Sequence, residues 1–214
     1  MQRIRIHYAK NHRLRYTSTQ DIQKNWERIL RRARLPIAYS QGFHPQPKIQ
    51  LACPLPLGML SQAEYVDFWL EDERPLQNVL EDITAAKHAG IDIRSISEVP
   101  TSDPALQSRL RSVTYRIRLE EVNTIDDLTK RINQLLEQDH IWLERRGKKY
   151  DLRPLIETCE VQPAIGRDTI DLTVTLTALP GATGRPEELL RAAGYDPNEA
   201  FIERQEIHFQ TAEN

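Results

Sequence analysis

Apolar and polar residues alternate in several stretches of the chain, as expected for β-strands with one face on a core. In residues 3–10, Ile4, Ile6 and Tyr8 share one face, and Arg3, Arg5 and His7 share the other. A short strand is expected at residues 48–52. Clearer alternation predicts strands at residues 64–70, 91–96, 113–119, 170–176 and 201–209.

Four other segments have apolar residues at helical spacing. The clearest apolar face consists of Ile22, Trp26, Ile29, Leu30 and Ala33. Ser18 and the threonines beside it are N-cap candidates for this helix, and Pro36 ends it. A second helix is expected from Pro75 to a cap at Gly90, and a third spans residues 125–136. The fourth begins at Pro186.

The order of these elements is β-α-β-β-α-β in the first half of the chain, which is the ferredoxin-like arrangement. The second half repeats the order, with a hairpin over residues 140–156 that turns at Arg146, Gly147 and Lys148. Residues 101–111 contain Asp103 and Pro104 and are expected to form a linker. We therefore predict an α+β protein with two tandem ferredoxin-like domains, residues 1–100 and 112–214.

The totals restrict the class of protein. The 214 residues carry a formal charge of −2, and no apolar run approaches the ~18 residues of a membrane helix. The N-terminus lacks the apolar stretch of a signal peptide. Cys53 and Cys159 are the only cysteines and lie far apart, so no disulfide framework or iron–sulfur spacing is present. We expect a cytoplasmic protein without a cofactor, a bound metal or a membrane partner.

The small net charge hides a strong asymmetry. Residues 1–50 contain 11 Lys and Arg against 2 Asp and Glu, whereas residues 51–108 contain 3 against 10. Such asymmetry is typical of a basic face for a polyanion or an acidic partner, or of ion pairing between the halves. No pattern indicates sequence-specific DNA recognition.

Residues 36–47, PIAYSQGFHPQP, directly follow the arginine-rich helix. Three prolines restrict the loop, and Gly42 permits a positive φ. Tyr39 and Phe43 could stack on unpaired bases, while Gln41 could hydrogen-bond to their edges; both aromatics could also be core residues. The residues expected to bind RNA are Arg13, Arg15, Arg28, Arg31, Arg32, Tyr39, Gln41, Phe43, His44 and Lys48.

This region also resembles the radical SAM-linked protein family. The resemblance rests on the run LPIAYSQGFHPQPKI, followed by PLPLG, Ser61 and the EYVD of residues 64–67, with YDLRPLI of residues 150–156 as a second segment. Where that family usually has His and Leu at the start of the first helix, this chain has Thr19 and Gln20, so a role for that histidine does not carry over. The resemblance implies an accessory protein of unestablished activity, similar to domains fused to or encoded beside radical SAM enzymes.

Two alternatives to RNA binding remain open at this level. The chain could bind a radical SAM enzyme or present a substrate to it, with Glu71, Asp72 and Glu73 as an acidic docking face. It could also be a metal-independent endoribonuclease, with His44 as a weak catalytic candidate and His12 as its partner. A binding or accessory role is the favoured interpretation, because nothing in the sequence brings these histidines together.

Overall fold

The structure is a computed structural model that describes residues 1–120, 125–163 and 169–210. It divides into two compact units, Met1–Leu110 and Arg111–Asn214. Helices and antiparallel strands occur in each, so the protein is α+β. Residues 101–110 lie in the first unit, where Leu106 is fully buried in a short 3-10 helix, η2 (Leu106–Arg109).

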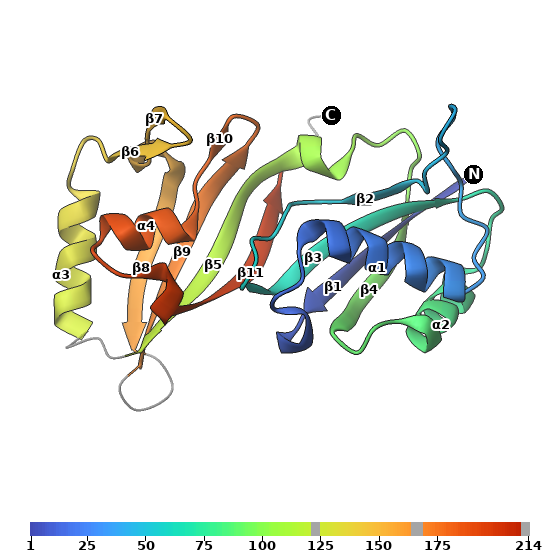
Figure 1. Ribbon diagram of the computed structural model, residues 1–214, viewed down its shortest axis with the longest axis horizontal. Coiled ribbons are helices and arrows are strands. Elements are labelled where there is room, and N and C mark those ends of the chain that lie inside the picture. Colours follow the sequence, from blue (N-terminus) through green and yellow to red (C-terminus); the bar gives the residue numbers. More distant parts are fainter. Residues whose placement is uncertain (121–124, 164–168, 211–214) are drawn as a thin grey trace. The chain divides into compact units, whose positions relative to one another are not determined.

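The first unit contains a four-stranded antiparallel sheet with the strand order β4-β1-β3-β2 (Figure 1). Its helices pack on one shared apolar core, which includes residues of both α1 and α2. The elements are β1 (Gln2–Lys10), η1 (His12–Leu14), α1 (Thr19–Arg32), β2 (Ile49–Leu51), β3 (Leu60–Leu70), α2 (Leu76–Ala86) and β4 (Ile91–Val99).

The apolar face expected for α1 is confirmed. Trp26 and Leu30 are completely buried, and the Trp26 ring packs edge-on against Tyr8 at a centroid distance of 5.0 Å. Burial of each such side chain contributes about 1.5–3 kcal/mol. Ser18 is the N-cap, since its hydroxyl accepts a hydrogen bond from the Asp21 amide at 3.2 Å. The helix is thus fixed by its core face and its cap, which leaves its outer face free for other roles.

The polar face expected for β1 is wrong at Arg3, whose side chain is only 1% exposed. Arg3 and Arg5 both form ion pairs with Asp67 of the neighbouring strand β3, at 2.6 and 2.8 Å. The reason is strand register, which places Arg5 directly opposite Asp67. Both arginines are therefore structural.

Gly90 is not the cap expected for α2, because that helix ends with Lys87 as its C-cap. Gly90 instead lies against Leu14. A Cβ atom on Gly90 would lie 2.4 Å from Leu14 Cγ, closer than two carbon atoms can approach. The position requires glycine for close packing.

The second unit has β5 between β11 and β9, with β8 and β10 on the other side of β9. The hairpin expected over residues 140–156 is present, but it forms a separate two-stranded sheet. Strand β8 follows it and was not expected. The elements are β5 (Leu110–Glu120), α3 (Ile125–Leu136), β6 (Trp142–Arg145), β7 (Lys148–Asp151), η3 (Arg153–Leu155), β8 (Ile156–Pro163), β9 (Thr169–Leu179), β10 (Ala182–Thr183), α4 (Pro186–Ala192), η4 (Pro197–Glu199) and β11 (Ala200–Phe209).

Among the described residues, no helix combines the length and the apolar character that a membrane span requires. Nor does this part of the chain contain a group of three or more His, Cys, Asp or Glu residues placed to hold a metal ion.

Candidate nucleic-acid interface

Helix α1 runs antiparallel to β2, the edge strand of the first unit's sheet (Figure 1). Two hydrogen bonds fix this arrangement. Thr19 Oγ1 donates to the carbonyl of Leu55 at 3.3 Å, and Gln23 Nε2 donates to the carbonyl of Ile49 at 3.3 Å. Because the chain enters β2 from the loop, the C-terminal half of α1 points toward the end of β2 from which the loop emerges.

A hollow of about 530 Å³ lies between α1 and β2. Its floor is partly apolar, and several side-chain amides surround it. Gln107, from η2, donates to the Leu51 carbonyl at one end. The lining residues are Thr19, Gln20, Gln23, Lys24 and Glu27 of α1, Ile49, Gln50 and Leu51 of β2, Pro54 and Gln107.

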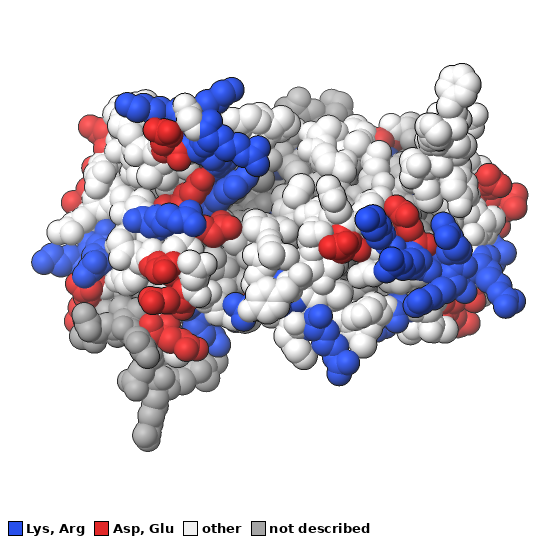
Figure 2. Space-filling view, viewed as in Figure 1, with Lys and Arg blue, Asp and Glu red and all other residues white. Residues whose placement is uncertain are grey.

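The outer face of α1 carries a row of cations, which we call the basic stripe: Lys24, Arg28, Arg31 and Arg32. At 3.6 residues per turn they fall within an arc of about 100° of the helix circumference. All four are exposed, and no carboxylate among the described residues forms an ion pair with them. Lys24 also lines the hollow, so the stripe begins there and continues toward the loop. Figure 2 shows Lys and Arg side chains gathered over this helix.

Residues 39–47 form what we call the aromatic loop, and its base is a short ladder. Tyr39 pairs with Pro47 in an isolated bridge. The Ser40 amide donates to the Gln46 carbonyl at 2.8 Å, and the Gln46 amide donates to Ser40 Oγ at 2.9 Å. Gly42, at the tip, has a φ of 132°, which favours glycine. The hydrogen bonds hold the loop in one shape without contacts from a core.

The two aromatic side chains of this loop are exposed and are not part of the core. Phe43 has a relative exposure of 102%, and Tyr39 has 42%. An isolated exposed apolar residue is common, but a fully exposed phenylalanine at the tip of a hydrogen-bonded loop is a feature of binding surfaces. Gln41 and His44 lie beside Phe43 and are also exposed.

The other expected RNA-binding residues are spread more widely. Arg13 and Arg15 precede α1, so they lie at the opposite end of a helix about 20 Å long from Arg31 and Arg32. Arg15 Nε donates to the Gly58 carbonyl at 2.8 Å, which gives that residue a structural role. Lys48 is half-buried at the base of the loop. The structure therefore places Arg31 and Arg32 at the end of α1 that leads toward the loop, and Arg13 and Arg15 at the other end.

The endoribonuclease alternative gains no geometric support. His12 lies in η1, before α1, whereas His44 lies in the aromatic loop beyond its other end. Both side chains are exposed, and neither forms a hydrogen bond with a carboxylate within the described residues. The structure therefore does not bring His44 and His12 together as an acid–base pair.

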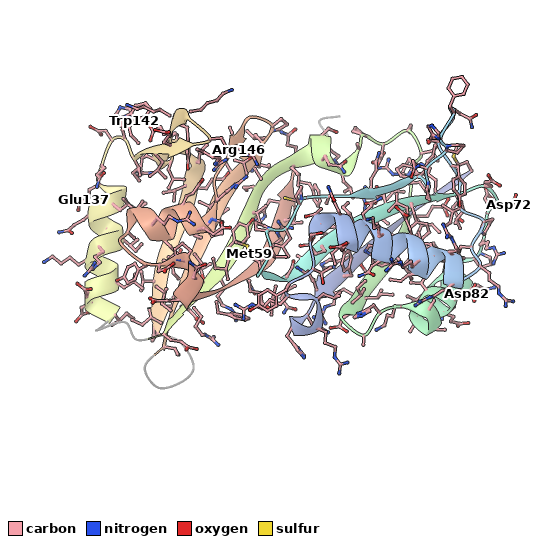
Figure 3. All side chains as sticks on the ribbon, in the orientation of Figure 1. Met59, Asp72, Asp82, Glu137, Trp142 and Arg146 are labelled. Atoms are coloured by element: carbon pink, nitrogen blue, oxygen red, sulfur yellow. The ribbon has the colours of Figure 1, made fainter. Side chains whose placement is uncertain are left out.

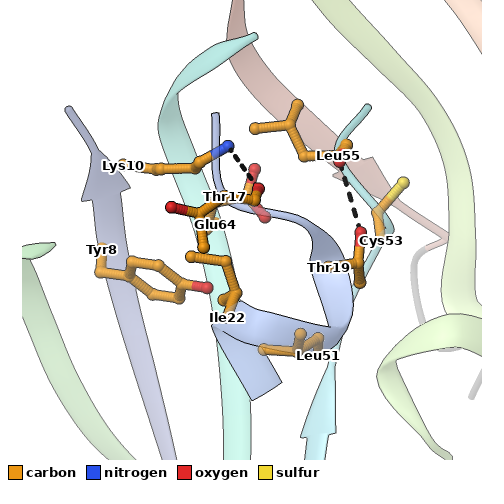
Figure 4. Close-up of a pocket in the computed structure, with 9 residues that line it drawn as sticks. All are labelled: Tyr8, Lys10, Thr17, Thr19, Ile22, Leu51, Cys53, Leu55 and Glu64. Carbon is orange, nitrogen blue, oxygen red and sulfur yellow. Dashed lines mark hydrogen bonds between the residues drawn. The ribbon is translucent and has the colours of Figure 1, made fainter. Parts of the chain in front are cut away.

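A second, much smaller cavity lies beside the N-terminus of α1 (Figure 4). Buried Lys10 and Glu64 line it, together with Tyr8 and Cys53. Lys10 Nζ donates to the carbonyls of Met59 at 3.2 Å and Thr17 at 3.4 Å. With a volume of about 10 Å³, the cavity is near the lower limit for one water molecule. Lys10 therefore anchors the surrounding loops, and no organic ligand fits there.

Comparison with known proteins identifies the family of the chain. A family model described as an uncharacterised protein conserved in bacteria, DUF2344, matches residues 3–186. The chain belongs to the DUF2344 family. The match includes all of the hollow, the basic stripe and the aromatic loop. No curated protein matches the sequence.

The hollow of this DUF2344 protein was not predicted from the sequence, although the residues of α1 that line it form a recognisable pattern. Gln20, Gln23, Lys24 and Glu27 have the spacing of one polar helix face, and they adjoin the apolar face. No local pattern indicates that β2 lies along this polar face, because that contact depends on tertiary packing.

Proposed function

We propose that this protein binds single-stranded RNA through the basic stripe, the hollow between α1 and β2, and the aromatic loop. The stripe would pair with phosphates, because guanidinium groups form bidentate hydrogen bonds with phosphate oxygens. Phe43 and Tyr39 would stack on bases, and Gln41 would contact their edges.

Electrostatics support this ligand over a neutral one. Arg28, Arg31 and Arg32 have no ion-pair partner among the described residues, so their charges are available to an anion. A single-stranded nucleic acid offers phosphates at regular spacing together with aromatic faces. A stripe of cations on the helix that precedes an exposed aromatic loop is complementary to both features.

The observation that carries the proposal is the complete exposure of Phe43 on a loop shaped by its own hydrogen bonds. Such a loop loses little conformational entropy when a ligand binds. A surface loop without a ligand has no evident need for a projecting phenylalanine.

The proposal is tested by fluorescence anisotropy of the full chain with a labelled single-stranded oligoribonucleotide. Phe43→Ala should weaken binding by about 5- to 100-fold, the range for loss of one base-stacking contact. Phe43→Trp preserves an aromatic face and should retain most of the affinity. Equal affinities for wild type and Phe43→Ala would exclude the loop as an RNA contact.

Exposure of Phe43 also favours a second candidate, an accessory protein that docks on a radical SAM enzyme. Support comes from the family resemblance of the loop sequence and from the acidic run Glu71, Asp72 and Glu73, which is exposed between β3 and α2. Phe43 would then enter a pocket on the partner. A complex that survives ribonuclease treatment and is lost in Phe43→Ala would favour this candidate.

We also infer that each unit is a ferredoxin-like domain. The support is the element order β-α-β-β-α-β and the strand order of each sheet, with the β6–β7 hairpin as an insertion in the second unit. We further infer a cytoplasmic location, because the chain has only two cysteines, Cys53 and Cys159, which lie far apart in the sequence and make no disulfide framework.

A further inference from the structure

The hairpin of the second unit has a solvent-facing side that its fold does not explain. Strands β6 and β7 pair Trp142 with Asp151 and Glu144 with Lys149. Residues directly opposite one another in a ladder point to the same side, so these four side chains share one face. The turn residues Arg146 and Gly147 both have positive φ, 51° and 75°, as in the tight two-residue turns that commonly connect hairpin strands.

The opposite face of the hairpin anchors it to the rest of the unit. Arg145 Nε donates to Glu188 Oε1 of α4 at 2.8 Å, and the guanidinium lies over the Tyr150 ring at 4.8 Å. Although burial acts to raise it, the pKa of Glu188 is lowered by the hydrogen bond from Arg145. Burial raises the pKa of Tyr150 to about 12. Packing and charge therefore account for this inner face.

On the outer face, Trp142 is 64% exposed and projects from the hairpin (Figure 3). It borders a hollow of about 540 Å³ that Leu143, Glu144 and Lys149 also line. The ring of His140 lies 5.5 Å from the Trp142 ring at an interplanar angle of 31°. Neither ring is buried, so packing gives no reason for an indole at this position.

Asp151 holds the histidine beside this indole. One carboxylate oxygen lies 2.8 Å from His140 Nδ1, and the other accepts the amide N–H groups of Ile141 and Arg153 at 2.8 and 3.0 Å. The Arg153 guanidinium does not take part, since its Nε donates to the Leu136 carbonyl at 2.9 Å. We call the rings of His140 and Trp142 the aromatic platform. Three hydrogen bonds to the Asp151 carboxylate preorganise it.

Cations surround the platform. Arg146 of the turn and Lys149 of the outer face are exposed, and neither forms an ion pair with a carboxylate of the described residues. Glu144 is the one acidic residue of the hairpin strands besides Asp151. Figure 2 shows a second gathering of Lys and Arg over this hairpin.

We propose that the outer face of the β6–β7 hairpin is a contact surface for single-stranded RNA, with a base stacked on Trp142 and phosphates held by Lys149 and by Arg146 of the turn. The choice of RNA as the ligand rests on the proposed function, but the residues are different ones. Charge complementarity favours this occupant, because cations flank an open aromatic face.

Tryptophan fluorescence gives a direct readout in the full chain. Of its three tryptophans, Trp26 is fully buried, Trp69 is half-buried beside the Arg3 guanidinium, and Trp142 is the most exposed. Titration with an oligouridylate of about 12 nucleotides should quench the Trp142 emission through stacking. Trp142→Ala should lose the quenching and bind about 5- to 100-fold more weakly. Trp142→Phe should lose the quenching but bind nearly as well as wild type.

Phe43→Ala, titrated in parallel, separates this inference from the proposed function. If Phe43→Ala binds normally while Trp142→Ala is weakened, the hairpin surface stands and the loop proposal fails. Absence of quenching, with unchanged affinity of Trp142→Ala, would overturn the hairpin surface even if Phe43→Ala is weakened. If wild-type protein binds no oligouridylate at low salt, both proposals fail.

Discussion

Two groups of arginines in the first unit have opposite environments. Arg3 and Arg5 of β1 converge on Asp67, whose side chain is 0% exposed, and Arg3 also donates to the Asp103 carbonyl at 2.6 Å. Arg31 and Arg32 of α1 are exposed and have no such partner among the described residues. The comparison shows that positive charge in this segment serves the fold on the strand and is available for binding on the helix.

The buried group also fixes the chain that follows β4. The Arg3 guanidinium donates to carbonyls of Asp103 and Pro104 as well as to Asp67, and it lies 4.9 Å from the Trp69 ring. All of these contacts lie within the first unit. Loss of the central carboxylate would leave two cations without their anion, at a cost that surface pairs do not incur.

Asp67→Ala tests the structural role of the buried arginines, and it should have the largest effect of the variants described here. We expect a loss of about 3–5 kcal/mol in the free energy of unfolding, since a buried charge loses its partner. Asp171→Ala is the matched control, because Asp171 pairs across strands with Arg118 but their side chains are 15% and 34% exposed. That variant should cost about 1 kcal/mol or less. Urea unfolding measures both, and equal losses would contradict the distinction.

Arg31→Ala combined with Arg32→Ala tests the other side of the comparison. RNA affinity should fall about tenfold, and the slope of log K against log salt should flatten by about 1.4, as expected for two lost phosphate contacts on a single strand. The free energy of unfolding should change by no more than about 0.5 kcal/mol.

The control for the arginine pair is Arg111→Ala, which removes an exposed arginine from the second unit. Its RNA affinity and salt slope should match those of wild type. A similar loss in this control would mean that net charge, rather than the basic stripe, determines binding.

Asp151 of the second unit tests, through pH, how much a partly exposed carboxylate stabilises the fold. This effect should be the smallest. The hydrogen bond with His140 lowers the pKa of Asp151; burial opposes this, and the N–H groups of Ile141 and Arg153 reinforce it. A lowered pKa in the folded state stabilises the fold above the unfolded-state pKa of about 3.9, and the benefit is lost as pH falls through the folded pKa.

Asp151→Asn should therefore be less stable than wild type at pH 7, and the difference should shrink as the solution is acidified below about pH 4. Urea unfolding at several pH values measures this difference. A difference that stays constant or grows below about pH 4 would show that the carboxylate charge does not contribute.

Much of the fold follows from local sequence patterns. Alternation located β1, β5 and β9 because each has one strongly apolar face, and helical spacing located α1 and α3. Strand β8 was missed because few of its side chains are buried, so its sequence lacks the alternation of a core strand. Its position beside β9 results from pairing rather than from its own pattern.

The candidate sites were less accessible from sequence. Exposure of the α1 arginines followed from the helix period, but burial of Arg3 depends on Asp67, which lies far away in the chain and opposite in the sheet. The hairpin turn was predicted from its glycine, whereas the exposure of Trp142 could not be, since an indole in an alternating strand is usually buried. Such features depend on which face of an element meets the core.

The central claim, that the basic stripe and aromatic loop bind RNA, is tested most directly in the native host. The tagged protein would be ultraviolet-crosslinked, recovered with and without ribonuclease treatment, and analysed for RNA and protein. We predict RNA crosslinked to the peptide that contains Tyr39 and Phe43. Recovery of a stoichiometric protein partner that survives ribonuclease, with no crosslinked RNA, would contradict the account.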